Sequence, residues 1–446
     1  MKPSGSYLGW FGIIRLGFVQ AALGAIVVIA TSTMNRVMVV ELALPAMLPG
    51  ALVALHYAVQ ILRPRLGFGS DIGGRRTPWI VGGMAVLGLG GVLAAAGIAW
   101  MTSNVAAGIA LAVLAFVLIG VGVGSAGTSL LVLLAKRVDP GKRAAAATIV
   151  WMMMIVGFVL TTVIVGALLD PYSAKRLLMI TAAVAVAALA ITLLATAGLE
   201  GQGRSTGEAE TEKPPFMKAL REVWAESRAR RFTIFVFVSM LAYSAQDLIL
   251  EPFAGSVFGF TPGASTKLAG VQHGGVLAGM ILVALAGTGW RGRRFGSLQT
   301  WTVGGCVASC AALLALTVGG LTGIGWPLKE NVFLLGAANG AFAVAAIGSM
   351  MIYASEGRAG REGVRMGLWG AAQAIAFGLG GFAGAAASDV ARAVIGADGP
   401  AYALVFGLES LLFLVAARLA ARLSAAQPSR HSFPSTAGAQ LAGQKV

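Results

Sequence analysis

Long apolar runs alternate with short polar connections along nearly the whole chain. A bilayer hydrocarbon core about 30 Å thick is crossed by roughly 20 apolar residues in a helix. Twelve runs reach that length, so the pattern predicts an all-α polytopic membrane protein with twelve transmembrane helices. The predicted spans are residues 11–31, 44–62, 79–100, 106–135, 144–168, 177–198, 232–252, 266–288, 297–320, 329–353, 364–388 and 402–421.

The composition agrees with a lipid environment. Of the 446 residues, 57% are hydrophobic and only 11% are charged, whereas a soluble protein has about 25% charged residues. The net charge of +15 raises the question of a nucleic-acid partner. Most Lys and Arg residues, however, lie in the tails and in the connections that follow even-numbered spans. This is the positive-inside pattern, which predicts cytoplasmic termini and no nucleic-acid partner. The opposite connections carry only Lys175, Arg176, Lys267, Lys329 and Arg392.

The polar segments predict four parts. Residues 1–198 and 232–423 are each expected to form a six-helix bundle. Residues 199–231 are expected to form a cytoplasmic linker, with an amphipathic helix after Pro214 and Pro215 that lies in the headgroup region. Residues 424–446 are polar, and we expect a disordered cytoplasmic tail.

A motif follows the second span. Its spacing resembles the signature loop of the major facilitator superfamily, and it lies on the side where that family has the loop. Ile72 departs from the pattern, because the family carries a basic residue there. A weaker copy without an aspartate occurs at Arg291, Arg293 and Arg294, after span eight. The resemblance implies a carrier-like fold of two six-helix bundles. The motif residues are Gly67, Asp71, Gly74, Arg75 and Arg76.

Two further blocks, residues 33–45 and 367–381, resemble the PucC family, also called the bacteriochlorophyll delivery family. The resemblance implies assembly of light-harvesting or reaction-centre complexes in a bacterial inner or photosynthetic membrane. It implies bacteriochlorophyll, or a biosynthetic precursor, as the ligand. It implies membrane lipid and antenna polypeptides, reaction-centre polypeptides or pigment-synthesis enzymes as partners. The short loop after Asp71 favours the branch encoded among bacteriochlorophyll-synthesis genes.

Two histidines lie inside predicted spans. His56 and Gln60 are one helical turn apart in span two and share a face. When the pair Arg75–Arg76 is aligned with the pair Arg293–Arg294, His56 falls within one residue of His273 in the other half. A neutral imidazole is a suitable axial ligand for the magnesium of a chlorophyll, so these three side chains are candidate pigment ligands. The alternative is a hydrogen bond to a neighbouring helix.

Acidic side chains at bilayer depth form a second set of candidates. Asp247 and Glu251 in span seven are four residues apart, and we expect Glu251 at the hydrated outer boundary. They could bind a proton, contact another helix or pair with Arg36. Glu409 lies in the middle of span twelve with no obvious local partner, and it could hydrogen-bond while protonated, as a proton or partner site. Arg36 and Glu41, near the outer end of span one, could pair with each other or bind an antenna polypeptide.

These patterns are compatible to different degrees with three classes of function. The leading prediction is a non-enzymatic assembly factor that binds pigment or nascent antenna helices. A proton-coupled secondary transporter of a small amphipathic molecule is the alternative. An enzyme fits worst, because no nucleophile–base set, metal-ligand spacing or nucleotide motif is present.

Overall fold

The computed structural model describes residues 7–60, 75–139, 142–200, 216–288, 296–356 and 362–424. All regular secondary structure within these ranges is helical. Eleven of the helices are long and apolar enough to cross a membrane. The helix of the second predicted span, Met47–Val59, is shorter, with 13 residues. The described residues therefore contain eleven long apolar helices and one short one, in the order that the hydrophobic pattern predicts.

The first half of the chain begins with one long, irregular helix. It runs through α1 (Trp10–Val28), π-helical turns at Ile29–Thr33 and Val37–Glu41, and α2 (Met34–Arg36) between them. The predicted first span ended at residue 31, ten residues too early. The helices that follow are α3 (Met47–Val59), α5 (Thr77–Met101), α6 (Val105–Arg137), α7 (Arg143–Leu168) and α8 (Ala174–Thr196).

The second half begins with the short linker helix α9 (Phe216–Ala225), which follows Pro215 as expected. The predicted seventh span is broken into α10 (Ser227–Asp247) and α11 (Leu250–Phe258). The remaining helices are α12 (Pro262–Thr288), α13 (Leu298–Thr322), α14 (Leu328–Glu356), α15 (Glu362–Ile395) and α16 (Asp398–Ser424).

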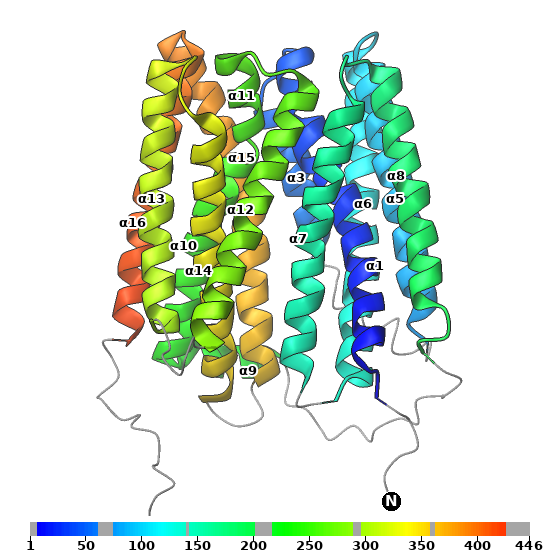
Figure 1. Cartoon of the computed structure of the whole chain (residues 1–446), viewed down its shortest axis with the longest axis vertical. Coiled ribbons are helices and arrows are strands. Elements are labelled where there is room, and N and C mark those ends of the chain that lie inside the picture. The colour runs from blue at the N-terminus through cyan, green and yellow to red at the C-terminus, as the bar shows by residue number, and fades with distance from the viewer. Residues whose placement is uncertain are drawn as a thin grey trace, which may run out of the picture.

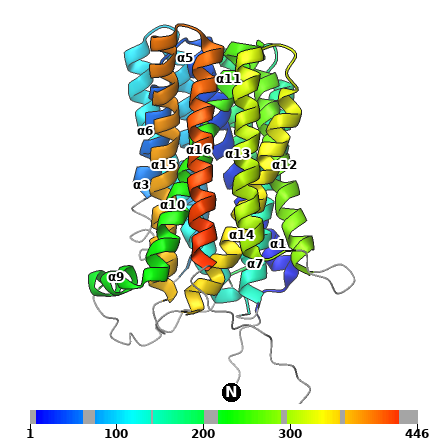
Figure 2. The ribbon, with the colours of Figure 1, turned by 90° about the vertical axis from the view of Figure 1, so that its left-hand side faces the viewer.

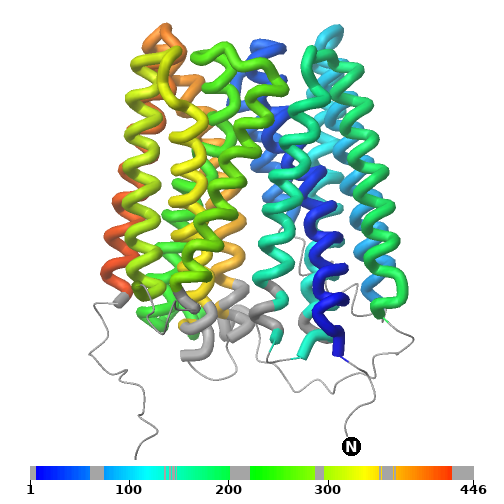
Figure 3. Tube along the Cα trace, in the orientation of Figure 1, coloured from blue at the N-terminus to red at the C-terminus, as the bar shows by residue number. Residues whose placement is uncertain are grey.

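The long helices stand side by side in two groups, α1–α8 and α10–α16 (Figure 1). Each group has its own apolar core. The same separation is visible along the Cα trace (Figure 3). The start of α1 and the end of α16 lie at one end of the molecule, here called the terminal end. The opposite end, here called the distal end, carries the connections 42–46, 102–104, 169–173, 259–261, 323–327 and 396–397.

Two helix pairs join the groups: α7 packs against α12, and α3 packs against α15. Aromatic rings mark both contacts. Phe158 of α7 meets His273 edge-on with ring centroids 4.9 Å apart, and Tyr57 of α3 stacks on Phe377 of α15 at 5.6 Å. Under the register that aligned the two halves, these two contacts occupy nearly equivalent places. The interface therefore has the approximate two-fold symmetry of an internal duplication.

Within the second group, α12 and α14 cross at very close range. A Cβ atom on Gly275 would lie 2.2 Å from the carbonyl oxygen of Phe333, and one on Gly336 would lie 2.1 Å from that of Gln272. Such close approach needs glycine on both helices, as is common between membrane helices. The crossing fixes the part of α12 that carries Gln272 and His273.

The linker helix lies across the terminal end, roughly perpendicular to the long helices (Figure 2). On this helix Val223 is buried, whereas Arg221 and also Trp224 are exposed. Arg365 of α15 donates two hydrogen bonds, of 2.9 and 2.7 Å, to the carboxylate of Glu226, which directly follows α9. Arg365 is itself fully buried, so this ion pair attaches the linker to the second group.

Candidate functional site

Residues 33–41, which belong to the predicted family signature, connect the two groups near the distal end. Their backbone takes part in two π-helical turns, which often occur at functional sites. The Asn35 amide donates to the carbonyl oxygen of Leu248 at 2.5 Å. The hydroxyls of Thr33 and Thr266 lie 3.1 Å apart. These bonds explain why a polar segment continues the first helix beyond the predicted boundary.

Arg36 and Glu41 form an ion pair, one of the two outcomes that the sequence left open. The Arg36 guanidinium is almost fully buried and also donates to the carbonyl oxygen of Phe260 at 2.7 Å. Together they line a pocket of about 750 Å³ between the two groups at the distal end. Tyr172 lies in the same pocket. Its partial burial and the charge of Glu41, opposed by Arg36, raise the pKa of its phenol to about 12.

Glu251 does not occupy the hydrated boundary that the sequence predicted. It is 2% exposed and accepts a hydrogen bond from the Ser32 hydroxyl across the interface. The reason is the break between α10 and α11 at residues 248–249, which separates Glu251 from the helix carrying Asp247. Asp247 and Glu251 therefore belong to two successive helices, α10 and α11, on either side of this break.

His56 and Gln60 lie together, as their spacing predicts. The Gln60 amide nitrogen is 3.0 Å from Nε2 of His56. Because an amide nitrogen only donates, the Nε2 lone pair of His56 accepts this bond. The ring also packs against Tyr57 and is 2% exposed. This geometry fits a buried, hydrogen-bonded histidine better than a ligand open to a macrocycle.

His273 has different surroundings. Its Nδ1 is 2.8 Å from the carbonyl oxygen of Ala269. A carbonyl only accepts, so Nδ1 carries the proton and Nε2 keeps its lone pair in the neutral ring. The side chain is partly exposed, and no hydrogen bond to Nε2 from another described residue is present. Of the two histidines, His273 is therefore the one whose free lone pair fits an axial ligand.

The groups around His273 come from both halves of the chain. Its neighbour Gln272 donates to Asp247 of α10 at 3.2 Å, and Asp247 is also partly exposed. On the facing side, the Gln20 amide of α1 lies 3.2 Å from the sulfur of Met154 on α7. Phe158, one turn from Met154, contacts His273. The candidate site therefore consists of side chains from both groups: Gln20, Met154, Phe158, Asp247, Gln272 and His273.

Three residues of this set were not predicted from the sequence: Gln20, Met154 and Phe158. Of these three, Gln20 could have been recognised as a candidate from the sequence, because it is an amide inside an otherwise apolar span. Its contribution became visible only once α1 and α7 were placed opposite α12.

Glu409 lies in the middle of α16, as predicted, and is 4% exposed. Neither carboxyl oxygen has a hydrogen-bond partner. It belongs to the second group, on a helix that packs against α10 and α13.

Most of the signature loop, including Gly67, Asp71 and Gly74, lies outside the described residues, as do Arg291, Arg293 and Arg294. Arg75 is exposed and Arg76 is buried. The backbone amides of Arg76 and Thr77 donate to the carboxylate of Glu200, the latter at 2.8 Å. Partial burial opposes ionisation of Glu200, but these hydrogen bonds outweigh it and lower the pKa of the carboxyl.

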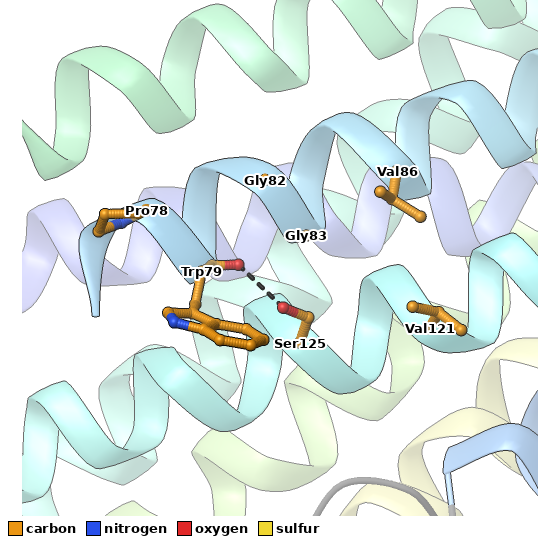
Figure 4. A pocket seen from close by; sticks show the side chains of 7 residues that line it. All are labelled: Pro78, Trp79, Gly82, Gly83, Val86, Val121 and Ser125. Carbon is orange, nitrogen blue, oxygen red and sulfur yellow. Dashed lines mark hydrogen bonds between the residues drawn. The ribbon is translucent and has the colours of Figure 1, made fainter. Parts of the chain in front are cut away.

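A second pocket, of about 340 Å³, lies between α5 and α6 near the terminal end (Figure 4). The Ser125 hydroxyl closes one wall by donating to the Trp79 carbonyl oxygen at 3.0 Å. The pocket belongs to one group only and has no ionisable side chain in its wall. Its lining residues are Pro78, Trp79, Gly82, Gly83, Val86, Val121 and Ser125.

Comparisons with known proteins give a consistent result. The family model described as "PUCC protein" matches residues 33–427. The chain is 54% identical to the "Bacteriochlorophyll synthase 44.5 kDa chain" of Rhodobacter capsulatus, over 94% of this chain and 97% of that one. It is 28% identical to "Protein PucC" of Cereibacter sphaeroides, over 90% of each chain.

Among solved structures, a bacterial homologue of the human lysosomal transporter Spinster superposes with a TM-score of 0.69. It is 14% identical and covers 93% of this chain and 96% of that one. At this identity the likeness concerns the fold, which is that of the major facilitator superfamily.

Proposed function

Because the chain belongs to the PUCC protein family, we propose that it assists the assembly of light-harvesting or reaction-centre complexes in a bacterial photosynthetic membrane and binds bacteriochlorophyll or a precursor. The observation that carries this proposal is the family match over residues 33–427, joined to 54% identity with a relative whose name refers to bacteriochlorophyll. The terminal end would face the cytoplasm, where the basic connections lie.

The proposed role is binding and delivery, without enzymatic turnover. Within the described residues no group of three or more His, Cys, Asp or Glu side chains could hold a metal ion. The polar groups near His273 are an amide, a thioether and a carboxyl that is already hydrogen-bonded to Gln272. These groups suit recognition of a large ligand with an apolar body and few polar atoms.

His273 is the residue that we propose as the ligand of the pigment magnesium. When bound, the pigment would supply a magnesium ion that accepts a nitrogen or oxygen donor from the protein. The hydrogen bond from Nδ1 to Ala269 orients the ring and leaves Nε2 as that donor. Phe158 offers an aromatic edge on the facing helix, and Asp247 with Gln272 provides polar atoms nearby.

The test is to purify the protein in mild detergent from a pigment-producing strain and to record its absorption spectrum and its co-purifying polypeptides. His273→Leu should lower bound pigment at least fivefold, with normal protein abundance. His56→Leu, alone or with Gln60→Leu, should change it by less than twofold. Pigment that is lost only in the His56 variants would move the site to α3. Protein without pigment and without antenna or reaction-centre polypeptides would favour the transporter alternative.

A further inference from the structure

A cluster of buried oxygen atoms lies between the two groups near the distal end. Glu251 of α11 accepts a hydrogen bond from the Ser32 hydroxyl, and its other carboxyl oxygen, Oε2, has no hydrogen-bond partner. Thr33, next to Ser32, meets Thr266 of α12 with the two hydroxyl oxygens 3.1 Å apart. The hydroxyls of Ser265 and Thr266 also lie near the Glu251 carboxyl group. Each of these five side chains is at most 9% exposed. Segments of both groups therefore contribute one carboxyl group and four hydroxyls to one cluster, here called the oxygen cluster.

The backbone is irregular on both sides of the oxygen cluster. Ser32 and Thr33 belong to the π-helical turn Ile29–Thr33, and Glu251 follows the break between α10 and α11. At that break the carbonyl oxygen of Leu248 accepts from the Asn35 amide, whose own oxygen is buried without a partner. In membrane carriers, interrupted helices supply oxygen ligands for sodium ions or protons. The local backbone is thus of the kind that binds small cations.

The buried charges near the oxygen cluster do not balance. Arg36 is the buried cation at this level, and its guanidinium is paired with Glu41. No ion pair joins Arg36 to Glu251 within the described residues, and Lys267 of α12 is exposed. One guanidinium therefore accompanies two carboxyl groups, which leaves one negative charge when both are ionised. A buried carboxylate without a counter-charge costs several kcal/mol, so one added positive charge would be favourable.

The donor atoms indicate which kind of ion fits. Carboxylate and hydroxyl oxygens are hard ligands, which suit cations without preference for nitrogen or sulfur. Calcium sites commonly combine several carboxylates, whereas the oxygen cluster has one, and a single negative charge matches a monovalent ion. The distal pocket of about 750 Å³ provides access, because its wall includes Arg36 and Gly255. These two residues lie one helical turn beyond Ser32 and Glu251, respectively.

We propose that Glu251, Ser32, Ser265 and Thr266 form a binding site for one alkali-metal cation, which enters from the distal pocket. Ser32 belongs to the first group and the other three residues belong to the second. A bound ion would therefore link the two groups and stabilise the arrangement in which they are in contact. The site is separate from His273 and does not depend on the proposed function.

The test is equilibrium dialysis of the purified full-length protein in detergent, at neutral pH, with choline chloride keeping the ionic strength constant. The probes are radioactive sodium and, separately, radioactive rubidium, which stands in for potassium. We expect saturable binding of one of these ions at about one per chain, as the single carboxylate of the site implies. Glu251→Gln keeps an oxygen towards Ser32 but removes the charge, so it should weaken binding about tenfold or more.

Two further variants complete the series. Thr266→Val removes one hydroxyl ligand at nearly constant shape and should also weaken binding. Glu330→Gln, which alters an exposed carboxyl on α14, should bind the ion as the wild type does. Absence of binding of both ions to the wild type would overturn the site, as would unchanged binding in Glu251→Gln and Thr266→Val.

A stability series keeps the test decisive if binding is weak or a variant folds poorly. A ligand that binds only the folded state raises its stability, so the Tm of the wild type should rise as sodium or potassium chloride replaces choline chloride. The Tm of Glu251→Gln should not respond, and in choline chloride it should equal or exceed that of the wild type. Ser32→Ala offers the same comparison if Glu251→Gln cannot be purified. An equal response of Tm in the wild type and in these variants would contradict the proposal.

Discussion

At the scale of single residues, hydrogen-bond direction separates side chains that look equivalent in the sequence. His56 accepts from an amide through Nε2, whereas His273 donates from Nδ1 to a carbonyl oxygen. The sequence placed both in apolar spans at matching positions, but it did not show which neighbour each ring meets. That difference, together with exposure, makes His273 the better candidate ligand.

Glu200 allows a prediction at the same scale. Its carboxylate caps the first turn of α5, and replacing a helix cap typically costs about 1 kcal/mol. Its folded-state pKa is lowered, so its contribution is fully present above the unfolded pKa. That contribution disappears as the pH falls through the folded pKa. We therefore expect Glu200→Gln to lower Tm at neutral pH and to match the wild type in strongly acid buffer.

Thermal unfolding followed by circular dichroism in detergent, across a pH series, measures this effect. Glu330→Gln serves as the control, since Glu330 is an exposed carboxylate in the first turn of α14 for which no hydrogen bond to a backbone amide is present among the described residues. A Tm difference between Glu200→Gln and the wild type that does not vary with pH would show that the carboxylate charge is not involved.

At the scale of helices, the hydrophobic pattern predicted where spans occur, but it revealed neither the extension of the first helix nor the break in the seventh. The first helix continues to Glu41 because Asn35 and Arg36 find acceptors on the other group. The seventh breaks at residues 248–249, where Leu248 supplies one of those acceptors. Neither partner is near in sequence, so local hydropathy could not reveal them.

The α12–α14 crossing gives an element-scale prediction with a control on the same helix. Gly275→Ala forces a methyl group against the Phe333 carbonyl, whereas a Cβ on Gly274 meets nothing within 4 Å. Overpacking costs about 1–3 kcal/mol, and alanine improves an open helical position by up to about 1 kcal/mol. Gly275→Ala should therefore lower Tm by several degrees, and Gly274→Ala should leave it equal or higher.

The site gives a second readout for this pair. Displacement of α14 would shift the turn of α12 that bears His273, so Gly275→Ala should also lower pigment binding. Equal Tm values for the two variants would mean that α12 and α14 can move apart without loss of stability.

At the scale of the whole molecule, two carboxylates join the groups at the distal end in a symmetric way. Asp170, which follows α7, accepts from the Thr261 hydroxyl at 2.7 Å and the Gly263 amide at 3.0 Å, at the start of α12. Asp389 of α15 accepts from the amides of Ala46 and Met47, at the start of α3, at 2.9 and 2.7 Å. Each therefore caps the N-terminus of a helix in the opposite group.

The duplication was predictable from the two arginine clusters, but these two distal contacts were not. An aspartate in a connection is ordinary in sequence. Its role depends on the helix start that the fold brings beside it. Because α12 and α3 form the two interfaces between groups, these caps favour the arrangement in which the distal end is closed.

The last prediction tests that closure. Thr33 is fully buried near the distal end, so a thiol placed there reports opening. In a background with Cys306→Ser and Cys310→Ser, Thr33→Cys should react slowly with a polar maleimide in detergent. Hydrogen bonds to charged groups contribute about 1.5–3 kcal/mol each, and 1.4 kcal/mol corresponds to a tenfold change in population. Asp170→Ala with Asp389→Ala should therefore speed labelling about tenfold or more.

Asp398→Ala, an exposed change at the same end within α16, should leave the rate unchanged. Equal rates in all three proteins would mean that the two caps do not hold the distal end closed. Closure would then depend on the buried contacts of Asn35, Arg36 and Glu251.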